Sequence, residues 1–166
     1  VIRVPLESMP DIGWPERPLG YLDLAKAQTL TQDAARLWIA DYLEVYENGT
    51  QLPAPRIIGT RISLPSDRAF GTYETAIGAA LGPPLGTDVD VPWNQTSPDV
   101  VLDYPIAPAT SSFAIRPLLA RLGVTTTTVL HYLAPDGGER VYQYVGDPGL
   151  VRLDPRWLGR VLSGAP

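Results

Sequence analysis

Proline and glycine interrupt this chain along its whole length, and this pattern limits the chain to short elements joined by ordered turns. The 166 residues include 18 prolines and 15 glycines, and no single tract gathers them. They stand between apolar runs, where proline fixes φ and removes a backbone donor while glycine supplies turn conformations. We therefore expect a domain of short strands and helices connected by structured loops.

Composition excludes several classes of function. Hydrophobic residues make up 45% of the chain, enough for a core, while the net charge of -5 and the single lysine, Lys26, argue against a nucleic-acid partner. The absence of cysteine rules out thiolate chemistry and cysteine-based zinc sites, and the lone histidine, His131, rules out any site that needs two histidines. We expect no cofactor and no haem or nucleotide partner.

Strand signals occur in several segments. Residues 1–7 alternate like a strand, and Val100 to Tyr104 forms another apolar run. Asn48-Gly49 predicts a tight hairpin between about 44–47 and a partner strand at about 56–64. Residues 124–134, rich in threonine and apolar side chains, and 139–145 predict a second hairpin around residues 135–138.

Helix signals are fewer. The main helix is predicted at about 31–44, with Thr29 or Thr31 as its N-cap and an apolar stripe that includes Leu37 and Trp38. Short helices are predicted near 73–81, before Gly82-Pro83-Pro84, and at 155–162, where Asp154-Pro155 provides an N-cap and a proline at the first position.

These elements predict a mainly β (α+β) chain, an antiparallel β-sandwich-like domain with one main helix. We expect a single β-rich domain over residues 1–153, followed by a C-terminal tail helix within 154–166. Because the chain opens in the middle of a strand pattern, we also expect it to be a piece of a longer protein.

Three residues are candidate metal ligands. Asp88 and Asp90 alternate in a loop, and carboxylate oxygens are ligands that calcium prefers. His131 is a candidate ligand or general base within the strand 124–134. The alternative is that the aspartates cap turns and that His131 is a strand residue hydrogen-bonded to its neighbours, because no calcium-loop pattern and no nucleophile motif accompanies them.

Two tryptophans are candidate partner-binding residues. Trp14 and Trp93 lie in proline-rich loops, where an exposed aromatic ring favours a binding surface. The alternative is that each ring holds its loop against the core, as we expect for Trp38 on the helix stripe. A hydrolase would need two carboxylates across a cleft, and the sequence does not bring together Glu44, Glu47, Glu74 or Glu139.

Several stretches carry a family resemblance. The chain resembles the extracytoplasmic N-terminal domain of bacterial membrane proteins of the HupE/UreJ family, and the matching stretches span nearly its whole length in order. They are Arg3-Val4-Pro5-Leu6-Glu7, Gly20-Tyr21-Leu22-Asp23-Leu24, Ala35-Arg36-Leu37-Trp38-Ile39-Ala40-Asp41-Tyr42, Ser63-Leu64-Pro65-Ser66-Asp67-Arg68, Asp103-Tyr104-Pro105-Ile106 and the run from Gly146 to Trp157.

The resemblance implies a location and a role. In such proteins a signal peptide precedes this domain and a polytopic membrane region follows it, and the family is associated with nickel transport. The resemblance thus implies a non-catalytic, periplasmic or extracytoplasmic domain, membrane-tethered through its tail helix, whose partner is its own membrane region or another membrane or periplasmic protein. The family's histidine-bearing segments have no counterpart here, so no metal ligand is carried over. A periplasmic metal-binding module and a hydrolase remain the alternatives.

Overall fold

The computed structural model describes residues 1–107 and 111–153. These residues form a mixed α+β fold that is mainly antiparallel sheet, as predicted, with 11 strands in four sheets. They divide into two compact units. The first unit contains residues 1–41 and 54–104, and the second contains residues 42–53 with the described residues from 105 onward.

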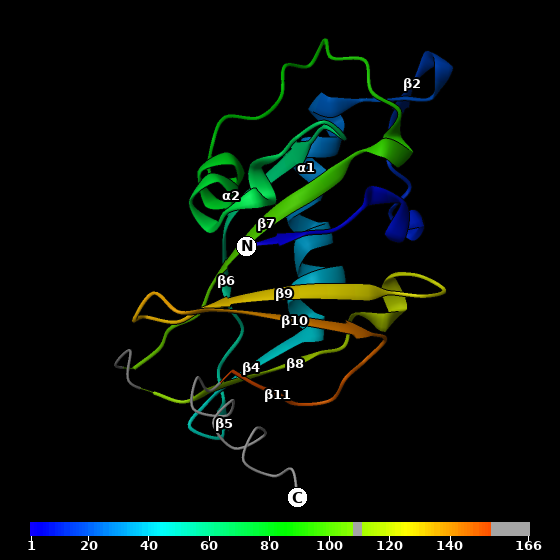
Figure 1. Ribbon diagram of the computed structural model, residues 1–166. Helices are drawn as coiled ribbons and strands as arrows, with labels where there is room; N and C mark the ends of the chain where they lie inside the picture. The colour runs from blue at the N-terminus through cyan, green and yellow to red at the C-terminus, as the bar shows by residue number, and fades with distance from the viewer. Residues whose placement is uncertain (108–110, 154–166) are drawn as a thin grey trace, which may run out of the picture. The chain divides into compact units, whose positions relative to one another are not determined.

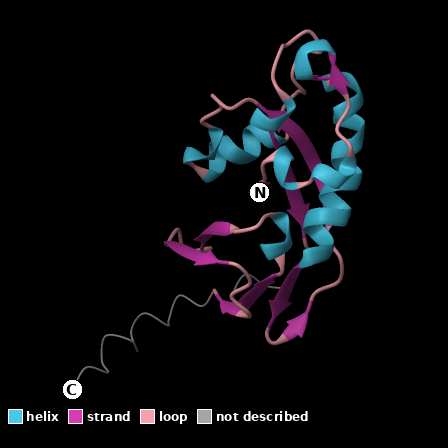
Figure 2. Cartoon of the chain, turned by 90° about the vertical axis from the view of Figure 1, so that its right-hand side faces the viewer, coloured by secondary structure: helices cyan, strands magenta, loops and turns pink. Residues whose placement is uncertain are grey.

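The first unit is built on a three-stranded antiparallel sheet of order β1-β7-β6. Helix α1 packs on β6 from one face of the sheet, and helix α2 lies on the other face (Figure 2). A small β2–β3 hairpin lies at one end of the unit. The elements are β1 (Ile2–Arg3), β2 (Glu16–Arg17), β3 (Tyr21–Leu22), α1 (Leu24–Ala34), β6 (Arg56–Ser63), α2 (Tyr73–Ala80) and β7 (Ser97–Asp103).

Loops as well as helices and strands contribute side chains to the core of this unit. Fully buried apolar residues are Leu6, Met9, Leu22, Ile39, Ile62 and Val100. Leu6 and Met9 come from a loop of short 3-10 turns, so the proline-rich opening segment supplies core contacts as well as connections.

The main helix begins earlier than predicted. α1 starts at Leu24, and the Asp23 side chain caps it by accepting a 3.2 Å hydrogen bond from the Lys26 backbone N–H. An aspartate cap satisfies a first-turn donor as well as a threonine does, and here the helix starts seven residues upstream of the predicted start. Thr31, predicted as a cap, is instead buried inside the helix, where its hydroxyl lies 3.1 Å from that of Thr60 on β6.

The end of this helix explains why its predicted apolar stripe is only partly buried. A π-helical turn spans Ala35–Ile39, and a 3-10 turn at Ala40–Tyr42 follows it. The π turn is wider than an α-helical turn, so it shifts the angular phase of the side chains within it. Leu37 is therefore exposed and Trp38 half-buried, while Ile39 is fully buried.

The second unit contains a four-stranded antiparallel sheet of order β11-β8-β4-β5 and a separate β9–β10 hairpin. Figure 1 shows the hairpin beside this sheet, and the Tyr142 hydroxyl donates to the Arg152 carbonyl at 3.3 Å. The buried apolar side chains of the second unit include Leu119, Leu122 and Leu153. The strands are β4 (Leu43–Glu47), β5 (Thr50–Gln51), β8 (Phe113–Pro117), β9 (Thr127–Leu133), β10 (Glu139–Val145) and β11 (Val151–Arg152).

Both predicted hairpin turns are present, but one strand partner was wrong. Asn48 and Gly49 both adopt positive φ and join β4 to β5, and β9 pairs with β10 over seven residues each. The strand expected to pair with β4, at 56–64, is β6 of the first unit. Pro53 and Pro55 interrupt the chain after the short β5, because proline cannot donate to a ladder.

The other predicted elements have mixed outcomes. Helix α2 and the strand around Val100 are confirmed, whereas the opening strand is restricted to Ile2–Arg3. The segment 113–122, whose sequence is compatible with either a strand or a helix, contains a strand and then a 3-10 turn. The tail helix at 155–162 lies outside the described residues. In the described part of the chain, no helix is both long and apolar enough to cross a membrane.

Candidate partner-docking site

The tip of the β2–β3 hairpin presents an apolar side chain to solvent in an unusual backbone conformation. Leu19 has φ 70° and ψ 13°, and the residue is 90% exposed. Left-handed backbone is uncommon outside glycine, asparagine and aspartate, and it persists only where the surrounding structure enforces it. Pro18 before it and Gly20 after it, also at positive φ, complete the turn.

Arg17 and the neighbouring loop hold this tip in place. The Arg17 Nη2 donates to the Val89 carbonyl at 2.9 Å and to Asp90 Oδ1 at 2.8 Å. On the other strand, Tyr21 bridges to Pro92, and the Leu22 N–H donates to the Val91 carbonyl at 2.8 Å. Both strands of the hairpin are therefore fixed to the loop that contains Asp88, Asp90 and Trp93.

The two candidate tryptophans differ in exposure. Trp14 is buried in the first unit, and its Nε1 donates to the Met9 carbonyl at 3.1 Å. Its ring therefore contributes to the core and does not offer a surface to a partner. Trp93 opens a 3-10 turn next to the β2–β3 hairpin and is half-buried, so part of its ring remains accessible.

The three candidate metal ligands are not brought together. Asp88 and Asp90 are exposed, and Asp90 is paired with Arg17. His131 belongs to the other unit, on β9, where its Nδ1 lies 2.7 Å from Glu139 Oε1 across the ladder. Within residues 1–107 and 111–153, no group of three or more His, Asp or Glu side chains is arranged to hold a metal ion.

Two other carboxylates, those of Asp67 and Asp99, both form ion pairs with Arg3. The Arg3 Nε donates to Asp99 Oδ1 at 2.7 Å, its Nη2 donates to Asp67 Oδ1 at 3.0 Å, and the guanidinium stacks 4.2 Å from the centroid of the Phe70 ring. Arg61 approaches Asp67 from the far side at 3.4 Å. We call Arg3, Arg61, Asp67 and Asp99 the charged clasp.

The electrostatics of the charged clasp favour a structural role. Asp99 is completely buried, and hydrogen bonding to it raises the pKa of Arg3. Burial alone would raise the pKa of Asp67, but the Ala69 N–H and the Arg3 and Arg61 side chains lower it below its usual value. The lowered pKa keeps the Asp67 carboxylate ionised, whereas a glycosidase acid needs a raised pKa.

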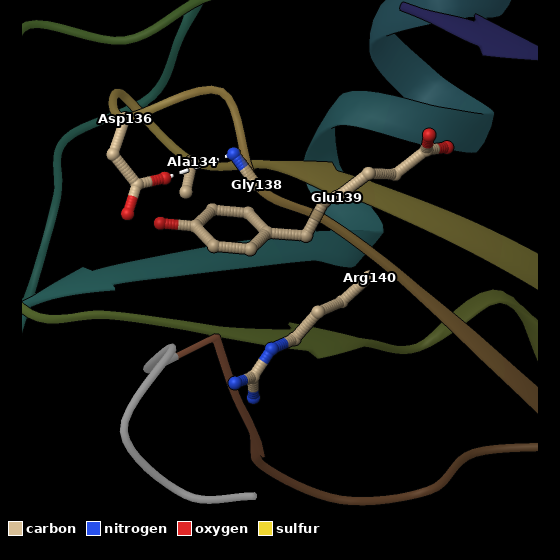
Figure 3. Close-up of a pocket in the computed structure, with 6 residues that line it drawn as sticks. Ala134, Asp136, Gly138, Glu139 and Arg140 are labelled. Carbon is tan, nitrogen blue, oxygen red and sulfur yellow. Dashed lines mark hydrogen bonds between the residues drawn. The ribbon is translucent and has the colours of Figure 1, made fainter.

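A shallow depression lies at the tip of the β9–β10 hairpin (Figure 3). Its volume is about 130 Å³, and it is lined by Tyr132, Ala134, Asp136, Gly138, Glu139 and Arg140. The Asp136 carboxylate accepts a hydrogen bond from the Gly138 N–H at 2.9 Å, so it stabilises the turn. The Glu139 and Arg140 side chains point away from each other (Figure 3). Small-molecule sites are usually several hundred Å³, so this depression is too small for one.

The sequence prediction included the loop around Trp93 but missed Leu19. One signal was present, because a large apolar residue stands between Pro18 and Gly20, at a turn where polar residues are the rule.

Comparison with protein-family models, with curated proteins and with solved structures found no match to this chain.

Proposed function

We propose that this chain is a non-catalytic, extracytoplasmic interaction domain of a bacterial membrane protein of the HupE/UreJ type. Its partner is the membrane region of the same protein or another membrane or periplasmic protein, and its role is accessory to metal transport, with nickel as the metal that the resemblance implies. The domain docks through the β2–β3 hairpin tip and the exposed part of Trp93.

The observation that carries the docking role is the conformation and exposure of Leu19. A 90%-exposed leucine contributes almost nothing to the core, and its left-handed backbone opposes folding. The surrounding contacts of Arg17, Tyr21 and Leu22 hold it there nevertheless. An apolar anchor presented on a fixed turn is suited to insertion into a partner pocket, where such side chains dominate binding energy.

Two of the stretches that carry the resemblance are joined by an ion pair. Arg3 belongs to the first stretch and Asp67 to the stretch Ser63 to Arg68, and the two side chains form an ion pair at 3.0 Å. The two stretches therefore contact each other in the folded chain through the charged clasp. A structural clasp is consistent with a domain that carries no chemistry of its own.

Site-specific photocrosslinking of the full-length protein in its bacterial host tests this proposal. With p-benzoylphenylalanine in place of Leu19, we expect a crosslink to the protein's own membrane region or to another membrane or periplasmic protein. The matched control carries the photoreactive residue at Gln51, which is exposed on β5 of the other unit. Equal crosslinking at both positions, or none at Leu19, would contradict the docking role.

Protease accessibility tests the location separately. In spheroplasts with an intact inner membrane, we expect added protease to degrade the domain while a cytoplasmic marker survives. Protection of the domain equal to that of the marker would contradict the extracytoplasmic assignment and leave the docking surface to be judged by the crosslinks alone.

A further inference from the structure

Carboxylates accompany the exposed Leu19 at the tip of the β2–β3 hairpin. Glu16 is exposed, and its Oε2 lies 3.8 Å from the position that a Cβ on Gly20 would occupy, so this carboxylate lies beside the tip. Asp88 and Asp90 are also exposed, and they belong to the loop that is hydrogen-bonded to both strands of the hairpin. The apolar anchor therefore has acidic surroundings.

The one basic residue of this region is engaged within the fold. Arg17 is the only lysine or arginine in residues 14–23 and 86–96. Its Nη2 donates to the Val89 carbonyl and to Asp90, and its Nε is enclosed, with no hydrogen-bond partner in the described part of the chain. Arg17 therefore neutralises Asp90. The carboxylates of Glu16 and Asp88 have no ion pair with any described residue, so the free charge of the tip is negative.

The sign of this charge separates two kinds of occupant for an exposed leucine, a protein pocket and a lipid surface. Anionic headgroups attract segments rich in lysine and arginine, and they repel a tip whose free charges are carboxylates. Even a single myristoyl chain, which is far more apolar than one leucine, gives only marginal membrane binding. A lipid surface is therefore a poor match for Leu19, whereas a pocket with positive charge at its edge matches both the anchor and the carboxylates.

We propose that the Leu19 tip docks into an apolar pocket of a protein and that lysine or arginine side chains rim this pocket. The proposal rests on the docking role proposed above and adds the chemistry of the partner. Leu19 enters the pocket, while Glu16 and Asp88 meet the cationic rim. Complementary charges at a rim speed association and disfavour wrong partners, whereas burial of the anchor supplies most of the binding energy.

Charge reversal in the photocrosslinking assay tests the cationic rim. The full-length protein carries p-benzoylphenylalanine in place of Leu19, and Glu16→Lys or Asp88→Lys is added to it. An exposed ion pair changes an equilibrium constant by up to about fivefold, so we expect each reversal to lower the crosslink yield by about two- to fivefold. Glu16→Gln removes the charge at nearly constant size and should have a smaller effect than Glu16→Lys.

The matched control is Asp33→Lys, which makes the same change of charge at an exposed residue of the same unit. Asp33 lies on α1, ten residues after the Asp23 cap and thus about 15 Å along the helix from the end of the hairpin. This distance exceeds the screening length of about 8 Å at physiological salt, so the crosslink yield should not change. Surface substitutions of this kind should shift Tm by less than about 2 °C, which thermal denaturation verifies for every variant.

The outcomes separate the cationic rim from the docking role. A crosslink yield that is unchanged by both reversals, or that falls equally with Asp33→Lys, would overturn the cationic rim and leave the docking role intact. Absence of any crosslink from position 19 in the parent would overturn the docking role and the rim with it.

Lipid vesicles provide the second arm of the test. We expect the 166-residue chain not to co-sediment with vesicles of phosphatidylglycerol and phosphatidylcholine. Co-sedimentation that Leu19→Gly abolishes would assign the tip to a lipid surface and refute the protein pocket.

Discussion

Leu19→Gly separates a docking residue from a folding residue, because the two roles predict opposite effects on stability. Leucine in left-handed backbone costs about 1–2 kcal/mol relative to right-handed or extended backbone, a cost that glycine does not carry. Glycine in turn lowers the free energy of unfolding by about 0.5–1 kcal/mol, because it gives the unfolded chain a greater entropy. The side chain itself is 90% exposed, so removing it forfeits only about 0.2–0.3 kcal/mol of burial, a tenth of the value for a fully buried leucine.

The sum of these terms lies between a loss of about 0.3 kcal/mol and a gain of about 1.3 kcal/mol, or a rise in Tm of up to about 5 °C for a chain of this size. Thermal denaturation followed by circular dichroism measures this. In parallel, photocrosslinking from the exposed part of the Trp93 loop, with p-benzoylphenylalanine in place of Asn94, should fall in yield when Leu19 is glycine.

The control for this prediction is Leu22→Ala on the adjacent strand. Leu22 is completely buried, so its truncation should cost about 2–5 kcal/mol. If Leu19→Gly lowered the free energy of unfolding by more than about 1 kcal/mol, Leu19 would have a structural role and the inference from its conformation would be wrong. Unchanged crosslinking would refute the docking role while leaving the strain argument intact.

Three further predictions concern the first unit. Arg3→Leu leaves Asp99 buried without its guanidinium partner and should lower the free energy of unfolding by about 3–5 kcal/mol, measured by urea denaturation; a loss below about 1 kcal/mol would show that the clasp is dispensable. The folded-state pKa of Asp67 is lowered, so the ionised carboxylate stabilises the fold above its unfolded-state pKa, and this stabilisation disappears as pH falls through the folded-state pKa. Asp67→Asn should therefore flatten the loss of Tm in acid below about pH 4. An unchanged dependence of Tm on pH would contradict this. Gly59→Ala places a methyl group 2.6 Å from Leu81 Cδ2 and 3.1 Å from the Ala80 carbonyl oxygen, so it should destabilise by about 1–3 kcal/mol, whereas Gly78→Ala, with open space around it, should not.

Local sequence signals predicted the elements whose stability is itself local. Asn48-Gly49 forms its turn because both residues tolerate positive φ, and the run from Thr127 to Val145 folds back around residues 135–138 for reasons within the run itself. Helix α2 lies where its cap and its terminating glycine place it. The mainly β, α+β class followed from the number of such elements.

Local signals did not decide which of several possible partners each element takes. Asp23 and the threonines at 29 and 31 are all acceptable caps, and the burial of Thr31 against Thr60 selects the first. The strand from Arg56 to Ser63 could pair with β4 by sequence, but it pairs with β7 in the other unit. These choices depend on contacts between residues far apart in the chain.

The candidate site shows the same division. Sequence alone predicted Asp90 as a metal ligand and Trp93 as a partner-binding residue, and the absence of cysteine and the single histidine excluded cysteine chemistry and any two-histidine site. Only the tertiary structure showed that Trp14 is buried, that His131 and the aspartates belong to different units, and that Leu19 is exposed in left-handed backbone. The physical reason is that residue type sets what a side chain can do, whereas burial and backbone strain are properties of its surroundings, which only the folded chain defines.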